Sequence, residues 1–112
     1  MKQRPQPLPD DDAKARLDAL AQVFADLKKA DDVKAFLRDL CTPAELEAMT
    51  DRWRVVPLLL KNIPYREIHE LTRVSVTTIG RVARTLEHGA GGYAAAVDRC
   101  NKRAVSFTEK TT

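Results

Sequence analysis

The chain has 112 residues, a net charge of +3 at neutral pH and 31% charged residues, which is enough for one domain with one modest hydrophobic core. No apolar run reaches the roughly 18 residues needed to cross a bilayer, and the N-terminal MKQRPQPLPDDD has no apolar segment of the kind found in secretory signals. We therefore expect neither a membrane protein nor a secreted one, but a cytoplasmic protein with no membrane partner.

Residues 1–10 contain three prolines in a polar context and are predicted to form a flexible arm. From Asp12, apolar residues recur at spacings of three and four, which predicts an amphipathic helix. Its apolar stripe is Leu17, Leu20, Phe24 and Leu27. Residues 30–32 are expected to interrupt this pattern. A second helix follows, with the apolar residues Val33, Phe36, Leu37 and Leu40.

A third helix is predicted to begin at the Thr42-Pro43 step. Thr42 can cap it, proline suits the first helical position, and Glu45 completes a capping box. The apolar stripe of this helix is Leu46, Met49, Trp53, Val56 and Leu60. Pro57 removes one backbone hydrogen bond. Because the stripe continues beyond this proline, we expect a kink rather than the end of the helix.

Residues 65–86, with the sequence YREIHELTRVSVTTIGRVARTL, predict a helix-turn-helix. Such a motif needs apolar residues where its two helices pack and polar residues on the outer face of the second. The inner positions are Ile68, Val74, Ile79 and Val82, supported by Leu71 and Leu86. Ser75 stands where the second helix needs its cap. The outer or edge positions are Thr77, Thr78, Gly80, Arg81 and Arg84.

Two residues depart from the usual pattern of this motif. His69 stands where the two helices approach closely and a small residue is usual, so its side chain could instead point to DNA. Arg73 stands in the turn, where a glycine in the left-handed conformation is common. We therefore expect Arg73 either to carry that strain or to be relieved of it by a modified turn.

The C-terminal part begins with a turn at Gly89, Gly91 and Gly92. A last helix is predicted from Tyr93 to Lys102, followed by a flexible tail over residues 104–112. No segment of useful length alternates apolar and polar residues. The prediction is therefore an all-α fold of six helices, with one helical domain over residues 11–103.

Charge is divided unevenly along the chain. Residues 10–51 carry eleven acidic and six basic residues, a balance of −5, whereas residues 52–86 carry seven basic and two acidic residues, a balance of +5. A basic surface on an acidic scaffold suits a polyanion, and the phosphate backbone is the commonest one. Double-stranded DNA is the predicted partner.

Roles within the helix-turn-helix follow from how such motifs dock. The N-terminal half of the second helix enters the major groove, so we expect base contacts from Val76, Thr77 and Gly80. Phosphate contacts are expected from Arg66, Arg73 and Arg84. His69 and Ser75 complete the predicted DNA-binding set.

The sequence offers little to support an enzyme. His69 and His88 have no nucleophile or acid at a suitable spacing, and no glycine-rich phosphate loop is present. Cys41 and Cys100 lack CxxC spacing or partner histidines, so no metal site is predicted. No cofactor is expected apart from the effector considered below.

The segment from Leu40 to Tyr93 resembles the Trp repressor superfamily, and most of all its repressor-like branch of small bacterial proteins. The matching stretches are LCTPAELEAMTDRWRVVPLLL, the helix-turn-helix quoted above and HGAGGY. The resemblance implies an intertwined all-helical homodimer, in which the N-terminal helices of one chain embrace those of the other. It also implies a bacterial regulator that is associated with the nucleoid when bound to DNA.

The resemblance further implies an effector pocket between the third helix and the second helix of the motif. The matching positions are Thr42, Arg52, Thr78, Arg81, Val82 and Thr85. Two arginines and three hydroxyls could hold a small carboxylate through charge-assisted hydrogen bonds. The same arginines could instead form salt bridges or touch phosphate. Val82 replaces the glycine that faces the indole ring in the family, so L-tryptophan is not the expected effector.

Two functions stay open at this point. The first is a sequence-specific, repressor-like transcriptional regulator that binds DNA as a homodimer, with or without an effector. The alternative is a helical protein-interaction module that uses the same scaffold without specific DNA readout. A salt-dependent shift of random duplex DNA would favour the first.

Overall fold

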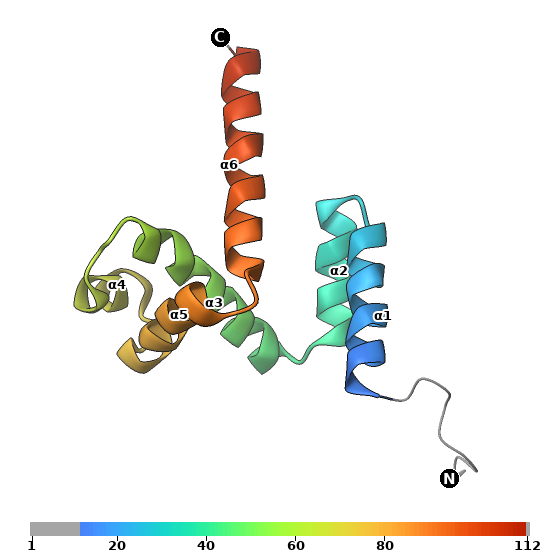
Figure 1. The fold of residues 1–112 in the computed structure, drawn as a ribbon, viewed down its shortest axis with the longest axis horizontal. Coiled ribbons are helices and arrows are strands. Elements are labelled where there is room, and N and C mark those ends of the chain that lie inside the picture. Colours follow the sequence, from blue (N-terminus) through green and yellow to red (C-terminus); the bar gives the residue numbers. More distant parts are fainter. Residues whose placement is uncertain (1–11, 112) are drawn as a thin grey trace. The chain divides into compact units, whose positions relative to one another are not determined.

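The computed structural model describes residues 12–111, with side chains described for residues 12–103. The fold over this range is all-α, as predicted, with six helices (Figure 1). They are α1 (Ala13–Asp26), α2 (Ala30–Leu40), α3 (Pro43–Leu60), α4 (Tyr65–Thr72), α5 (Val76–His88) and α6 (Gly92–Thr111). The arm predicted for residues 1–10 lies outside the described residues.

The chain divides into two compact units, Met1–Pro43 and Ala44–Thr112. The range predicted as a single domain, residues 11–103, therefore spans parts of both units. The first unit contains α1 and α2, and the second contains nearly all of α3 together with α4 to α6. Each unit is described separately below.

The first unit is a hairpin of two helices (Figure 1). Asp12 caps α1, since its side chain accepts a hydrogen bond of 2.8 Å from the backbone N–H of Ala15. The rings of Phe24 and Phe36 meet edge to face, with centroids 5.2 Å apart, and join the two helices. Neither α1 nor α2 contains a buried residue. The apolar stripes predicted for this hairpin therefore keep much of their surface in solvent.

The break between α1 and α2 lies earlier than predicted. It falls at residues 27–29, and the predicted break at residues 30–32 is the first turn of α2. Asp31 and Asp32 are favourable there, because carboxylates near a helix N-terminus meet the positive end of the helix dipole.

Helix α3 runs through Pro57 without ending, as predicted. Its buried residues are Val55 and Val56, both completely inaccessible to solvent. Three residues of the predicted stripe, Met49, Trp53 and Leu60, are exposed within the single chain. The helix thus buries a face centred on the two valines, while much of the predicted stripe faces outward.

The hydrophobic core of the second unit is built around the helix-turn-helix. It consists of Val55, Val56, Ile68, Val74, Ile79 and Val82. All four inner positions predicted for the motif are in this cluster, and Leu86 packs against it. The supporting role predicted for Leu71 was wrong, because this side chain is mostly exposed.

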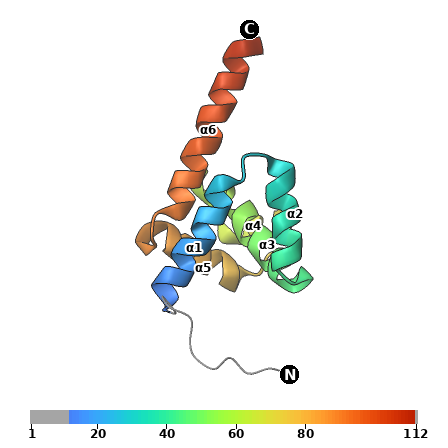
Figure 2. The same ribbon diagram turned by 90° about the vertical axis from the view of Figure 1, so that its right-hand side faces the viewer.

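Helix α6 follows a glycine turn, as predicted, and rises away from the other helices of its unit (Figures 1 and 2). The rings of Trp53 and Tyr93 stack with centroids 6.4 Å apart and attach its first turn to α3. The helix continues to Thr111, beyond the predicted end at Lys102. No glycine or proline lies between Tyr93 and Thr111 to stop it. Flexibility of residues 104–112 stays a prediction.

Gly89 is the C-cap residue of α5, and its backbone N–H donates a hydrogen bond of 2.8 Å to the oxygen of Thr85. A Cβ atom there would lie 2.5 Å from the backbone oxygen of Thr85, well inside contact distance.

Across the described residues, none of the helices combines the length and the apolar character needed to cross a bilayer.

Candidate nucleic-acid interface

The turn of the helix-turn-helix is very short. Helix α4 ends at Thr72 and α5 begins at Val76. Arg73 adopts the left-handed conformation, with φ 67° and ψ 7°. A residue with a side chain is strained there. Of the two alternatives posed by the sequence, Arg73 therefore carries the strain itself.

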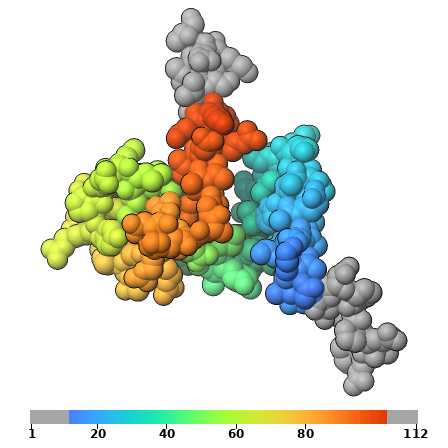
Figure 3. Space-filling model, in the orientation of Figure 1, coloured from blue at the N-terminus to red at the C-terminus, as the bar shows by residue number. Residues whose placement is uncertain are grey.

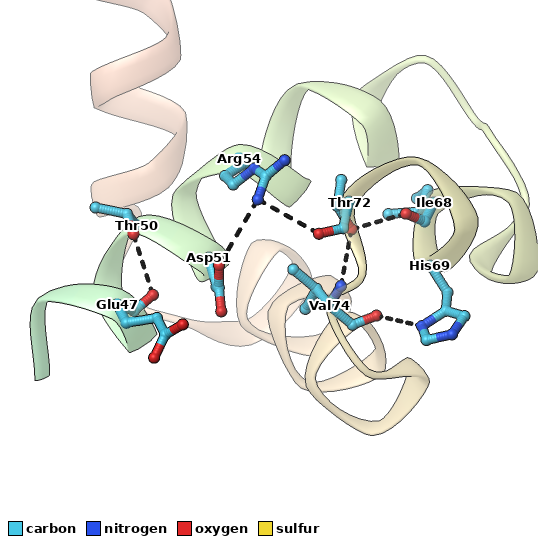
Figure 4. A network of polar contacts seen from close by, with 8 residues as sticks. All are labelled: Glu47, Thr50, Asp51, Arg54, Ile68, His69, Thr72 and Val74. Carbon is cyan, nitrogen blue, oxygen red and sulfur yellow. Dashed lines mark hydrogen bonds and ion pairs between the residues drawn. The ribbon is translucent and has the colours of Figure 1, made fainter. Parts of the chain in front are cut away.

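A network of hydrogen bonds surrounds this turn (Figure 4). The backbone N–H of Arg73 donates to the oxygen of His69 at 2.7 Å. The Thr72 hydroxyl donates to the oxygen of Ile68 at 2.7 Å and accepts from the N–H of Val74 at 3.1 Å. From α3, Nη1 of Arg54 donates to the oxygen of Thr72 at 3.3 Å. Nothing in the sequence pattern indicated these roles for Thr72 and Arg54.

His69 points into the turn. Its Nδ1 lies 2.8 Å from the backbone oxygen of Val74 (Figure 4), and the side chain is half-buried. Its role in DNA binding, predicted from its position in the motif, stays a prediction. The structure assigns the side chain a structural contact of its own.

Ser75 caps α5, as predicted. Its hydroxyl accepts a hydrogen bond of 3.1 Å from the N–H of Thr78 and donates to the Thr78 hydroxyl at 3.0 Å. These bonds satisfy a backbone donor that the helix itself cannot. The beginning of the second motif helix is therefore firmly defined.

Val76 and Thr77 form an exposed surface at the start of α5. Val76 is 49% exposed and Thr77 is also exposed. Gly80 is half-buried, and a Cβ placed on it would lie 3.7 Å from the ring of Tyr65. The absence of a side chain at Gly80 thus leaves room beside an aromatic ring that the sequence analysis did not single out. Helices α4 and α5 lie together at one side of the second unit (Figure 3).

Three arginines accompany this surface. Arg66 comes from α4, Arg73 from the turn and Arg84 from α5, and all three are exposed. Within the described part of the chain, no ion pair or hydrogen bond holds their guanidinium groups. Unpaired guanidinium groups on a surface can bind phosphate without first breaking a salt bridge.

A hollow of about 250 Å³ lies between α3 and the start of α5. Its lining residues are Ala48, Asp51, Arg52, Arg73, Val74, Ser75, Thr78 and Arg81. Three predicted effector residues are brought together there: Arg52, Thr78 and Arg81. Three arginines face one carboxylate, that of Asp51, so the hollow favours an anion.

The other predicted pocket residues are not among those that line this hollow. Val82 belongs to the hydrophobic core and is 1% exposed. The Thr85 hydroxyl donates to the backbone oxygen of Arg81 at 3.0 Å. Thr42 belongs to the first unit. Asp51 also lines the hollow, although no sequence pattern indicated it, and its Oδ1 lies 3.9 Å from Nη1 of Arg54.

Comparison with known sequences identifies relatives of this chain. Residues 15–101 match the model of the family described as Trp repressor protein. An uncharacterised protein of Bacillus subtilis (strain 168), YerC, is 32% identical over 94 residues. That match covers 84% of this chain and 90% of YerC.

Solved structures also resemble this fold. A candidate Trp repressor from Staphylococcus aureus matches with a TM-score of 0.72 and 31% identity, over 78% of this chain and 87% of that protein. A TrpR-like protein from Eubacterium eligens ATCC 27750 matches with a TM-score of 0.71 and 32% identity, over 77% of this chain and 89% of that protein. The sequence and structure comparisons thus agree on the same family, that of the Trp repressor.

Proposed function

Because this chain belongs to the Trp repressor family, a family of DNA-binding regulators, we propose that it is a sequence-specific transcriptional repressor acting as a homodimer. The observation that carries this proposal is the start of α5, where Val76 and Thr77 are exposed beside three unpaired arginines. A capped helix with exposed apolar and hydroxyl groups suits the major groove.

Base and phosphate contacts divide between these residues. Val76 offers an apolar surface for a thymine methyl group, and the Thr77 hydroxyl can donate and accept hydrogen bonds. Arg66, Arg73 and Arg84 bind phosphates and set the register of the helix on the duplex. Ser75 acts indirectly, because its hydroxyl is engaged in the cap of α5.

The homodimer is supported by apolar surface that one chain leaves in water. Leu17 of α1, Leu40 of α2 and Trp53 of α3 are exposed, and no residue of α1 or α2 is buried. Exposed apolar residues in such number are typical of an interface. A second copy of the chain covers them, and a two-fold dimer presents two recognition helices to two half-sites.

The hollow beside α5 holds a small anionic effector, such as a carboxylate. Arg52 and Arg81 supply two cations from two helices, and the Thr78 hydroxyl is a third ligand group. The ligand alters DNA affinity only to the extent that it binds one orientation of α5 better than another.

Selection of binding sites from a random duplex library tests DNA readout. We expect one sequence family to be enriched, with affinity that falls steeply as salt increases. Thr77→Ala relaxes the selected sequence, whereas Arg84→Ala weakens all duplexes alike and lowers the salt slope by about 1. Arg99→Ala, in exposed α6, is the matched control and leaves both unchanged.

Absence of enrichment and of any salt-dependent DNA binding would overturn this proposal. It would favour the interaction module instead, in which the exposed Leu71 and Val76 contact another protein.

A further inference from the structure

We propose that His69, Thr72 and Arg54 are positioning residues for DNA readout. They hold the Arg73 turn in its left-handed conformation and thereby fix the direction in which α5 projects. We call these three side chains the clamp. Its effect on DNA binding rests on the proposed function. The clamp itself is a property of the turn and can be tested without DNA.

The clamp is needed because the sequence places an arginine, not a glycine, at position 73. Glycine enters the left-handed conformation without steric penalty, but Arg73 does not. Such a backbone persists only where its surroundings hold it. The Arg73 side chain is exposed and unpaired, so its own contacts do not supply this support.

The neighbours of Arg73 supply it instead. Four backbone groups of the turn are bonded: the oxygen of Thr72, the N–H of Arg73, and both the N–H and the oxygen of Val74. Three of the four partners are side chains, those of Arg54, Thr72 and His69. Any other conformation at Arg73 would move these groups and leave donors or acceptors unsatisfied.

Burial strengthens the clamp. The Thr72 residue is only 8% exposed and Val74 only 4%, so water cannot easily replace a lost bond. Val74 also belongs to the hydrophobic core. The clamp therefore joins α3, α4 and the residue that leads into α5 (Figure 4).

The contact also determines which ring nitrogen of His69 carries a proton. A backbone oxygen can only accept a hydrogen bond, so Nδ1 must carry the proton and donate. Neutral His69 is therefore the Nδ1–H tautomer, and Nε2 is left as an acceptor. This state is a spectroscopic signature of the clamp.

The experiment compares pairs of variants that differ only in the clamping group. Thr72→Val removes the hydroxyl and keeps the shape, while Thr72→Ser keeps the hydroxyl. His69→Ala removes the donor, while His69→Asn places an amide N–H at the position of Nδ1. Affinity is measured for the duplex selected by the wild type and for a random duplex, and amide hydrogen exchange is measured at Val74 and Thr78.

We expect His69→Ala and Thr72→Val to lose about tenfold in affinity for the selected duplex and about tenfold in amide protection. The random duplex should lose less than about threefold, because the phosphate-binding arginines are intact. His69→Asn and Thr72→Ser should retain most of the wild-type values. Equal losses on both duplexes with unchanged exchange at Val74 would overturn the proposal.

Arg73→Gly supplies the decisive background. Glycine needs no clamp in this conformation, so His69→Ala should cost much less affinity and protection in Arg73→Gly than in the wild type. Within the glycine background, the proteins with and without His69→Ala both lack the Arg73 charge. The loss of that charge therefore does not affect the measured cost of His69→Ala. The same cost of His69→Ala in both backgrounds would contradict the clamp.

Failure of the clamp and failure of the proposed function are distinguishable. If the wild type selects no duplex, the function fails, yet nitrogen NMR of His69 and hydrogen exchange at Val74 still test the clamp. An Nδ1–H tautomer and a protected Val74 amide would support it. Finding neutral His69 as the Nε2–H tautomer would overturn it.

Discussion

The α1–α2 hairpin and the second unit contain similar amphipathic patterns but use them differently. Six apolar residues of the second unit form a buried cluster, whereas neither helix of the hairpin has a buried residue. Leu17, in the predicted stripe of α1, is 66% exposed. An apolar stripe in a sequence therefore indicates that a surface needs covering. It does not say whether the same chain covers it.

This difference separates two sources of stability. The second unit carries its own core, which holds the helix-turn-helix together. Two packed helices are too few to enclose a core, so the hairpin needs apolar surface from elsewhere. The proposed homodimer supplies that surface, and the stability of the hairpin should then depend on protein concentration.

The largest effect is expected in the core of the second unit. Ile79 is completely buried, so Ile79→Ala should lower the free energy of unfolding by about 2–5 kcal/mol through lost burial and a cavity. Urea unfolding at fixed protein concentration measures it. Val76→Ala, a truncation on the exposed side of the same helix, is the control and should change stability by less than about 0.5 kcal/mol. Similar costs for both variants would contradict the assignment of the two faces.

The next effect is expected in the hairpin and concerns association. If a partner chain buries Leu17, Leu17→Ala should weaken the dimer by about 1.5–3 kcal/mol, the value of burying such a side chain. Sedimentation across a dilution series measures the dissociation constant. A wild-type protein that is a stable monomer at low micromolar concentration would refute the dimer, and Leu17→Ala would then be nearly neutral.

Much of this architecture could be predicted from the sequence because it depends on local chemistry. The cap at Ser75 follows from a short polar side chain before an apolar run. The inner residues of the helix-turn-helix follow from helical spacing, and the turn at Gly89 from glycine itself. Of the predicted effector pocket, Arg52, Thr78 and Arg81 line one hollow.

The remaining features depend on contacts between distant residues. Arg54 donates to Thr72, eighteen positions away, and no periodic pattern marks either residue for that role. Val55 is buried although it lies off the predicted stripe of α3, because α4 and α5 pack on that face. Val82 was predicted both as an inner residue of the motif and as a pocket residue, and its 1% exposure within the core supports the first role.

A smaller effect should distinguish the two helix caps. Ser75→Ala should cost about 1 kcal/mol of global stability, because α5 is part of the core and its cap is lost. Asp12→Ala removes an equivalent cap from α1, but that helix has no buried residue to couple it to the core. We expect that loss to appear mainly as faster amide exchange in the first turn of α1. Equal effects on the global transition would show that the two units unfold together.

The smallest effect is expected at the ion pair between Lys14 and Asp18, and it offers a sensitive check on the hairpin. The two groups are 3.0 Å apart on the surface of α1, with side chains 86% and 66% exposed. Water and salt screen such pairs, so a double-mutant cycle should give a coupling of about 0.3–0.5 kcal/mol. It should fall further at high salt, where the screening length shrinks to about 3 Å at 1 M. The matched cycle is Lys102 with Asp98 on α6, another exposed pair at 3.2 Å. A coupling above about 1 kcal/mol at Lys14 alone would mean that this side of α1 is covered in solution. The dimer would then bury the polar face of the hairpin as well as its apolar stripe.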